Sequence, residues 1–252
     1  MRIRVHVVTY DRPAMLLRLL GDLGRSADPW HGDVEVEVFD DASPSDYAIV
    51  REFLRYRAWT FTRSSTNHGK HHHWKLITSA YATVEASEAD LVVHMPDDVR
   101  LCKRFFHRAE AIWDGLDEPH KLAVNLLRDS LREGKSCWTS IVPTIADHII
   151  YTGWVDGLFM AGRRYFELLN YRAVPVPAPF TASPQRGSGV YAYISEKLID
   201  HGQFYCVKES LAVHVDSPSK MNRIERGRNP IRTLQFVDGD EEQQRLSKCA
   251  CL

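Results

Sequence analysis

The sequence predicts an α/β fold in which a mainly parallel sheet is covered by helices. Over the first hundred residues, short apolar runs alternate with stretches whose apolar residues recur at helical spacing. Polar residues follow three of the apolar runs, and a chain of 252 residues with 44% hydrophobic content can bury a sizeable core. This β-α-β-α order favours parallel strands, and such sheets bind ligands beyond the carboxyl ends of their strands.

Each element of the first half has its own signal. β-branched residues predict a strand at residues 3–8, and Pro13 then opens a helix whose apolar stripe includes Leu16, Leu20 and Leu23. Valines that alternate with glutamates from residue 34 predict a half-exposed strand that ends at 39–41. A helix is expected at 45–57, a short strand at 59–61, a helix at 70–85 and a buried strand at 91–95.

The second half is less regular, because glycines and prolines after about residue 120 indicate turns and extended segments. Helices are expected at 163–170 and 191–201, and a strand near 204–215. We divide the chain into residues 1–120, a continuation of the same domain at 121–216, and a polar C-terminal arm at 217–252. The arm reads as basic and then as a solvated acidic segment. Its charged residues are Arg223, Arg226, Arg228, Arg232, Asp238, Asp240, Glu241 and Glu242.

Composition excludes several classes of protein. The formal net charge of −1 creates no overall field that attracts nucleic acid. The sequence contains no run of eighteen or more apolar residues, so no membrane span is expected. The N-terminus enters a strand pattern without a secretory segment, and a cytoplasmic protein is therefore expected. The five cysteines are odd in number and mostly scattered, which argues against a disulfide framework and a zinc knuckle.

Three polar clusters follow predicted strands, at residues 9–11, 40–41 and 97–98, and parallel strands would bring them to one crevice. The adjacent carboxylates Asp97 and Asp98 suit a divalent cation, Mn²⁺ or Mg²⁺, held against a nucleotide diphosphate, because such cations take carboxylate and phosphate oxygens together. The alternative is a helix-capping turn, since paired aspartates are common where loops begin.

Four segments carry a resemblance to a known family. Residues 7–13, 39–43, 67–70 and 95–99 read VVTYDRP, FDDAS, NHGK and MPDDV. Together they resemble the nucleotide-binding half of GT-A fold glycosyltransferases, particularly the family 2-like group. The resemblance implies that residues 1–120 are a nucleotide-sugar-binding half and residues 121–216 an acceptor-side half. It also implies that a sugar is transferred from a nucleotide-diphosphate donor to a hydroxyl acceptor, and a UDP-sugar is the expected donor.

The same resemblance assigns residues. It implies that Thr9, Tyr10, Arg12 and Asp41, with Asp40 beside them, hold the base and ribose of the donor. The family's metal motif is Asp-any-Asp, and here Pro96 takes the first position. Asp97 then occupies the middle position and Asp98 the final, metal-contacting one.

Two later segments also match. Residues 154–164 resemble the family's glycine-bearing segment that faces the sugar, although a buried turn would read alike. Residues 211–219 resemble a strand end whose histidine, here His214, adds a ligand to the metal or a donor to the pyrophosphate. A structural role for His214 stays open.

The resemblance fails where a general base would stand. Inverting members place an acidic pair ahead of the late helix, but residues 186–191 hold no acid. Asp156 is our substitute candidate and Glu196 the second, because a base must reach the proton that it removes. A retaining reaction, in which the departing phosphate takes the proton, needs neither.

The histidine cluster at residues 68 and 71–73 invites a zinc site. We favour a different interpretation, in which Lys70 and one histidine face the pyrophosphate near a helix N-terminus.

Two rival functions are weighed. A catalytically inert nucleotide-sugar or saccharide-binding module would keep Asp41 and Asp98 but transfer nothing. A dinucleotide-dependent oxidoreductase is disfavoured, because residues 9–14 contain no glycine. The acceptor stays open among saccharide, lipid-linked sugar and hydroxymethylated DNA, since the arm arginines could clamp a pyrophosphate or follow a DNA backbone.

Overall fold

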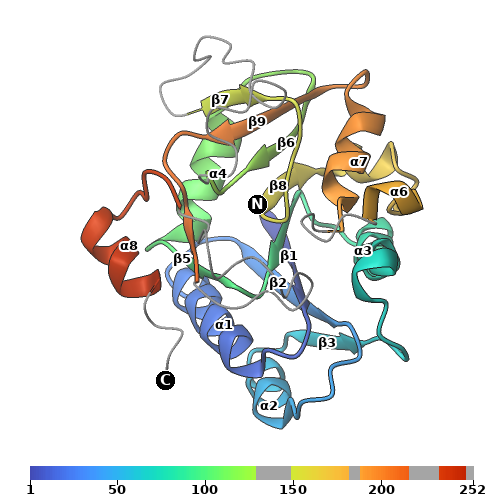
Figure 1. The fold of residues 1–252 in the computed structure, drawn as a ribbon. Helices are drawn as coiled ribbons and strands as arrows, with labels where there is room; N and C mark the ends of the chain where they lie inside the picture. The colour runs from blue at the N-terminus through green and yellow to red at the C-terminus, as the bar shows by residue number, and fades with distance from the viewer. Residues whose placement is uncertain (129–148, 182–187, 216–232, 248–252) are drawn as a thin grey trace.

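A computed structural model describes residues 1–128, 149–181, 188–215 and 233–247 (Figure 1). Over these residues the chain forms an eight-stranded sheet in the order β3-β2-β1-β4-β8-β6-β9-β7 and a separate two-stranded sheet of β10 and β5. The larger sheet contains strands from both sides of residue 120, so it joins the two predicted halves of the chain.

The first half confirms the predicted parallel arrangement. Its strands are β1 (Arg2–Thr9), β2 (Asp33–Asp40), β3 (Thr60–Arg63) and β4 (Leu91–Pro96), and the pairs β1–β2, β1–β4 and β2–β3 are all parallel. The connecting helices are α1 (Pro13–Ala27), α2 (Ala48–Tyr56) and α3 (Gly69–Glu85). Helix α2 begins three residues later than predicted, because the side chains of Ser43, Ser45 and Tyr47 bond to the loop after β1 instead.

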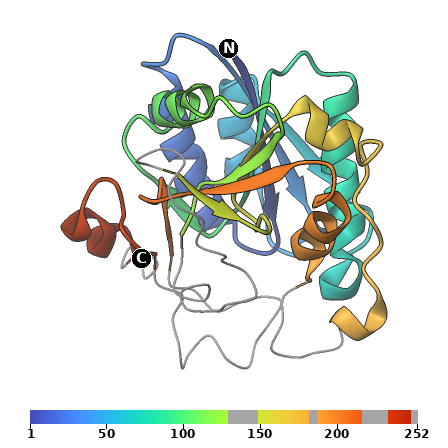
Figure 2. The ribbon, with the colours of Figure 1, turned by 90° about the horizontal axis from the view of Figure 1, so that it is seen from above.

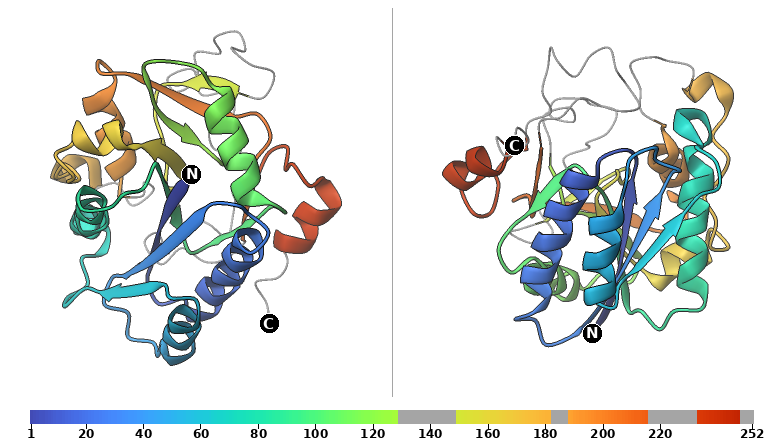
Figure 3. Two further views of the ribbon diagram at one scale, coloured as in Figure 1. Left: turned by 180° about the vertical axis from the view of Figure 1, so that it is seen from behind. Right: turned by 90° about the horizontal axis from the view of Figure 1, so that it is seen from below.

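Helices cover both faces of the sheet, which explains the apolar runs in its central strands. Val5 and Val7 of β1 pack in a core with the leucines of α1, whereas Val8 packs with α3. Helix α4 (Phe105–Gly115) shares the first face with α1, and helix α7 (Val190–Leu198) shares the second with α3. Figure 2 shows α1 and α4 on one side of the sheet and α3 and α7 on the other, and Figure 3 shows α1 beside α2.

The second half is mixed. Strand β8 (Phe159–Gly162) inserts antiparallel between β4 and β6 (Lys121–Asn125), and β9 (Gln203–Val207) then pairs parallel with β6 and antiparallel with β7 (Ile149–Thr152). The sequence did not indicate β6, β7, β8 or α4. Helix α5 (Arg163–Glu167) ends earlier than predicted, and the chain then turns through positive φ at Asn170 and Tyr171. A short helix, α6 (Ala178–Thr181), follows.

The prediction of a single strand near 204–215 is wrong. The segment contains β9 and β10 (Ala212–His214), which belong to different sheets, since β10 pairs antiparallel with β5 (Val99–Leu101). Ser210 separates them, because its backbone N–H donates to the Gln235 carbonyl and its hydroxyl donates to the Leu234 carbonyl. This break allows β10 to leave the large sheet and reach the segment that follows β4.

The acidic part of the C-terminal arm is more ordered than predicted. Asp238 accepts a bond from the backbone N–H of Lys103 at 2.7 Å and pairs with Arg108, so it is not solvated. Residues Asp240–Ser247 form helix α8, whose Leu246 is buried. The arginines of the predicted basic arm lie outside the described residues. No helix in the described part of the chain is both long and apolar enough to cross a membrane.

Candidate functional site

The polar segments at residues 9–11, 40–41 and 97–98 lie where β1, β2 and β4 end at their carboxyl edge, and their side chains form three networks. The first joins the ends of β1 and β4 and contains Thr9, Arg12, Asp97 and Asp98. The second is centred on Asp40, and the third on Asp41, the residue that follows β2.

The first cluster is a buried network around two carboxylates. The Thr9 hydroxyl donates to Asp97 Oδ2 at 2.7 Å. Arg12 Nη1 donates to Asp97 Oδ1 at 3.2 Å and to Asp98 Oδ2 at 2.9 Å, so one guanidinium nitrogen bridges both carboxylates. Asp11 adopts a positive φ of 55° between β1 and α1, and this turn lies directly before Arg12.

Burial dominates the electrostatics of this cluster. Burial raises the pKa of Asp97, the charge of Arg12 lowers it, and the charge of Asp98 raises it again; the net direction is upward. For Arg12, burial lowers the pKa, but Asp98 and Asp97 together raise it above its usual value. The guanidinium therefore stays charged and offsets part of the negative charge of the pair.

His214 joins the same cluster from the second half of the chain. The β10–β5 pairing sets His214 opposite Val99, and the backbone N–H of Val215 donates to the Asp98 carbonyl at 2.9 Å. His214 Nδ1 then lies 3.8 Å from Asp98 Oδ1. The structure thus brings together Asp98 and His214, the two metal ligands predicted from the sequence.

This donor set fits a divalent cation that takes its other ligands from a substrate. One carboxylate oxygen and one imidazole nitrogen face each other, and Mn²⁺ and Mg²⁺ sites commonly combine one or two protein ligands with phosphate oxygens. Within the described ranges, no three His, Cys, Asp or Glu side chains form a group that could hold a metal by themselves.

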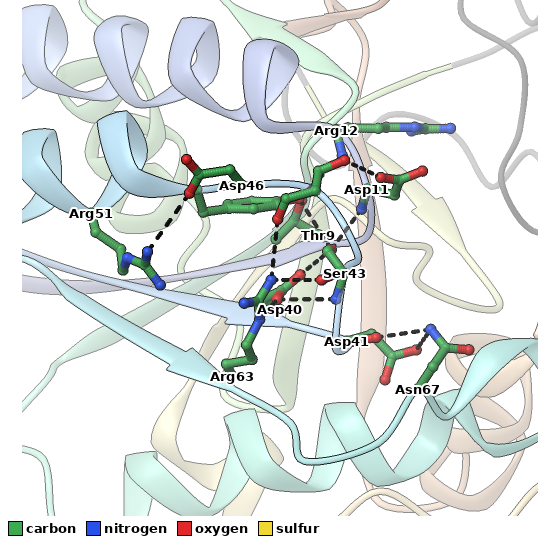
Figure 4. Close-up of polar contacts among 12 residues, drawn as sticks. Thr9, Asp11, Arg12, Asp40, Asp41, Ser43, Asp46, Arg51, Arg63 and Asn67 are labelled. Carbon is green, nitrogen blue, oxygen red and sulfur yellow. Dashed lines mark hydrogen bonds and ion pairs between the residues drawn. The ribbon is translucent and has the colours of Figure 1, made fainter.

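Asp40 is turned into the protein. Its side chain is fully buried, and Oδ2 accepts bonds from Arg63 Nε at 2.6 Å and the backbone N–H of Ser43 at 3.2 Å. The Ser43 hydroxyl donates to Oδ1. Figure 4 shows Asp40 between Ser43 and Arg63. Asp40 therefore holds the loop after β2, and its ligand-binding role stays a prediction.

Asp41 organises the start of α3. Its Oδ1 accepts the backbone N–H of His68 at 2.9 Å, and its Oδ2 accepts the backbone N–H of Gly69 at 3.1 Å and Asn67 Nδ2 at 3.1 Å. His68 Nδ1 lies 2.6 Å from Oδ1. The motif at 67–70 is thus bound to the end of β2, which the separate segments did not reveal.

Tyr10 and Lys70 are half-buried beside these clusters, Tyr10 after β1 and Lys70 in the first turn of α3. The histidines near Lys70 diverge: His68 faces Asp41, His71 lies 2.9 Å from the Thr181 hydroxyl, and His73 is buried. Burial lowers the pKa of His73 to about 4. Because these histidines have different partners, the divergence favours our interpretation over a zinc site there.

Asp156 lies close to the N-terminus of α7. Its backbone N–H donates to Asn125 Oδ1 at 2.8 Å, and a Cβ added at Gly157 would lie 3.6 Å from the Tyr191 ring and 4.0 Å from Pro96. Burial raises the pKa of Tyr191, and the negative charge of Asp156 raises it further. The segment at 156–157 is therefore packed between α7 and the end of β4.

Glu196, the second base candidate, is exposed on α7, whereas Ser195 beside it is buried and its hydroxyl donates to the Tyr191 carbonyl one turn earlier. Asp156 directly precedes Gly157, the residue that approaches Pro96 at the end of β4, whereas Glu196 is exposed.

Sequence reasoning missed a buried polar pair behind the site. His94 Nε2 lies 2.7 Å from the Tyr191 hydroxyl, and His94 is fully buried on β4. A histidine inside an otherwise apolar strand was the available signal, because buried polar groups need partners. Asn125, which bonds to both Asp156 and the Trp154 carbonyl, gave no such signal.

Comparison with known proteins gave matches only at the level of structure. No family model matches the chain, and no curated protein matches its sequence. The mannosyltransferase PcManGT from Pyrobaculum calidifontis, in complex with GDP-Man and Mn²⁺, superposes with a TM-score of 0.53 at 17% identity, covering 80% of this chain and 53% of its own.

S. aureus TarS 1-349 in complex with UDP-GlcNAc gives a TM-score of 0.60 at 14% identity, covering 89% of this chain and 61% of its own. The TarS complex with UDP gives 0.55 at 15% identity, with coverages of 86% and 61%. The chain thus spans 53% to 61% of the length of the chains in these three structures. At these identities the likeness establishes the fold: the chain has the GT-A-like fold of nucleotide-sugar glycosyltransferases.

Proposed function

We propose that the protein is a metal-dependent glycosyltransferase that moves a sugar from a nucleotide-diphosphate donor to a hydroxyl acceptor. The observation that supports it most is the gathering of Thr9, Arg12, Asp97, Asp98 and His214 at the carboxyl edge of a GT-A-like sheet. Neighbours with this fold were crystallised with GDP-Man and with UDP-GlcNAc. The resemblance in the sequence favours a UDP-sugar as the first donor to test.

The donor's base and ribose would lie near the β1 and β2 ends. Asp41 is placed there with Thr9, because the backbone N–H of Asp41 donates to the Thr9 carbonyl at 3.1 Å. Tyr10 and Lys70 flank the same edge of the sheet. The backbone N–H groups of His68 and Gly69 donate to Asp41, so our proposal of a pyrophosphate near Lys70 rests on the charge of Lys70.

Asp98 and His214 would hold Mn²⁺ or Mg²⁺. When bound, such a cation neutralises the charge that develops on the diphosphate leaving group. Arg12 contributes a positive charge to the same cluster, and Thr9 donates a hydrogen bond to Asp97. The Mn²⁺ in the PcManGT complex is consistent with this proposal.

Asp156 is our candidate for the base that takes the proton from the acceptor hydroxyl. It is half-buried, its main chain is fixed by Asn125, and its charge is felt at the start of α7. Glu196 is the weaker candidate because it is exposed. In a retaining reaction, the departing phosphate oxygen would take the proton instead.

The test is hydrolysis or transfer of UDP-sugars and GDP-sugars with and without Mn²⁺. We expect turnover that Asp98→Asn abolishes and that Asp200→Asn, a change at an exposed aspartate of α7's C-terminal turn, leaves unchanged. Binding of the donor without any turnover across an acceptor panel would instead favour the inert binding module.

DNA stays a proposed acceptor through Arg223, Arg226, Arg228 and Arg232, which lie outside the described residues. If they contact DNA phosphates, changing Arg223, Arg226 and Arg228 to Gln should lower transfer to hydroxymethylated DNA and flatten its salt dependence, while donor hydrolysis persists. Loss of donor hydrolysis in the same variant would mean that these arginines clamp the pyrophosphate.

A cytoplasmic location also stays a prediction.

A further inference from the structure

Arg12 occupies an unusual position for a residue expected to hold the base and ribose. One nitrogen, Nη1, reaches both Asp97 and Asp98, and the side chains of all three are at most 10% exposed. Figure 4 shows the Arg12 side chain pointing away from Asp40 and Arg63, the cluster at the end of β2. Its guanidinium therefore binds the two carboxylates at the end of β4.

The position of Arg12 is fixed by its main chain. Its backbone N–H donates to the Tyr47 hydroxyl at 3.1 Å, and its carbonyl accepts the N–H of Leu16 in the first turn of α1 at 3.0 Å. Pro13 then begins that helix, which fixes the backbone further. Since the main chain cannot follow a ligand, any change of partner must come from rotation of the Arg12 side chain.

A divalent cation at Asp98 would stand close to this guanidinium. Asp98 directs Oδ1 toward His214 and Oδ2 toward Arg12, so cation and arginine would share one carboxylate. Like charges at such separations repel strongly in a buried site. Two carboxylates cannot balance the charges of Arg12 and a divalent cation, but two carboxylates and a diphosphate can.

We propose that Arg12 couples metal binding to donor binding. In the free protein its guanidinium offsets part of the negative charge of Asp97 and Asp98 and opposes the cation. In the complex it turns to the diphosphate and releases Asp98 to the metal. Arg12 is thus a diphosphate-binding and positioning residue. The inference rests on the proposed function in one respect, the nucleotide-diphosphate nature of the donor.

The test measures Mn²⁺ binding by electron paramagnetic resonance, without nucleotide and with UDP or GDP, and needs no turnover. For the unaltered protein we expect weak Mn²⁺ binding that tightens by about tenfold or more when the nucleotide is added. Arg12→Gln should bind Mn²⁺ about tenfold more tightly than the unaltered protein without nucleotide, and should lose most of the gain that nucleotide brings.

Three variants control this experiment. Arg51→Gln removes an arginine of α2 that is 46% exposed and pairs with Asp46, and it should leave Mn²⁺ binding unchanged. Arg12→Lys keeps the charge and should bind Mn²⁺ as weakly as the unaltered protein. Adding Asp98→Asn to Arg12→Gln should abolish the gained affinity, which ties the bound Mn²⁺ to this site.

Equal Mn²⁺ affinities of Arg12→Gln and the unaltered protein would overturn the proposal. If Arg12→Gln does not fold, calorimetry on the unaltered protein decides whether the two ligands are coupled: UDP or GDP must bind more tightly with Mn²⁺ than without it. Independent binding of the two would overturn the coupling. Failure to bind any nucleotide would contradict the proposed function, whereas the Mn²⁺ titration of Arg12→Gln would still report on Arg12.

Discussion

Asp41→Ala should both destabilise the fold and weaken donor binding, and the structure gives the size of the first effect. The carboxylate accepts the backbone N–H groups of His68 and Gly69, the Asn67 amide and a close approach from the His68 ring. Asp41 itself is 3% exposed. The alanine variant would leave these donors without their acceptor at the start of α3.

The magnitude follows from the bonds lost. A helix N-cap contributes about 0.5–2 kcal/mol, and hydrogen bonds to a charged group contribute about 1.5–3 kcal/mol each. Asn67 is exposed, so water replaces part of what is lost, and the bonds are not additive. We expect a loss of about 3 kcal/mol in the free energy of unfolding, which lowers Tm by roughly 6–12 °C for a chain of this size.

Urea and thermal unfolding of Asp41→Ala, Asp41→Asn and the surface control Asp200→Ala would test this. Asn keeps one acceptor oxygen, so its loss should be intermediate, and the control should not change. Assayed where each variant is folded, Asp41→Ala should raise the donor KM more than it lowers kcat, the pattern of lost uniform binding. An unchanged Tm would refute the capping argument, and an unchanged KM would refute the ligand contact.

Three further predictions concern the carboxylate pair, the base and the buried histidines. Asp98→Asn should abolish transfer and weaken donor binding, with Asp97→Asn milder, as donor titrations with Mn²⁺ would show. Asp156→Asn should lower kcat by about 100-fold or more while donor affinity persists; equal activity would exclude it as the base. Acid should destabilise the fold, because burial lowers the pKa of His73 to about 4 and that of His94 to about 3. Below about pH 6.5 these histidines take up protons in the unfolded chain but not in the folded chain. Each histidine then removes up to about 1.4 kcal/mol per pH unit down to its folded pKa, and urea titrations of His94→Gln should show a shallower pH slope than the unaltered protein.

The parallel half was predictable because its central strands β1 and β4 are covered by helices on both faces. Val5 and Val7 pack with α1 while Val8 packs with α3, so apolar residues of β1 lie on both faces of the sheet. Polar residues begin where the apolar runs of these strands end, which places the clusters at one edge without knowledge of the contacts. Sequence reasoning therefore expected Thr9 near Asp97 and Asp98, but it assigned Arg12 to the base and ribose and not to the carboxylate pair.

The partners within each cluster were not predictable. Asp41 lies 27 residues from His68, and Asp98 bonds to Arg12 across 86 positions. Strand β8 runs antiparallel beside β4, and its four residues carry no distinct period. The position of His214 depends on the break at Ser210, which a pattern of apolar residues at 204–215 conceals.

Residues 186–191 contain no acidic residue, and the ionisable residue at the start of α7 is Tyr191. The hydroxyl of Tyr191 is held by His94, a residue of the strand that ends at Asp97 and Asp98. Because burial and Asp156 both raise the pKa of Tyr191, its phenol stays protonated and can only donate or accept hydrogen bonds, not remove a proton. Among the negative charges that raise the pKa of Tyr191, Asp156 acts most strongly, and it comes from the segment before β8 and not from α7. If the reaction inverts configuration, Asp156 is therefore the residue that we propose as the base.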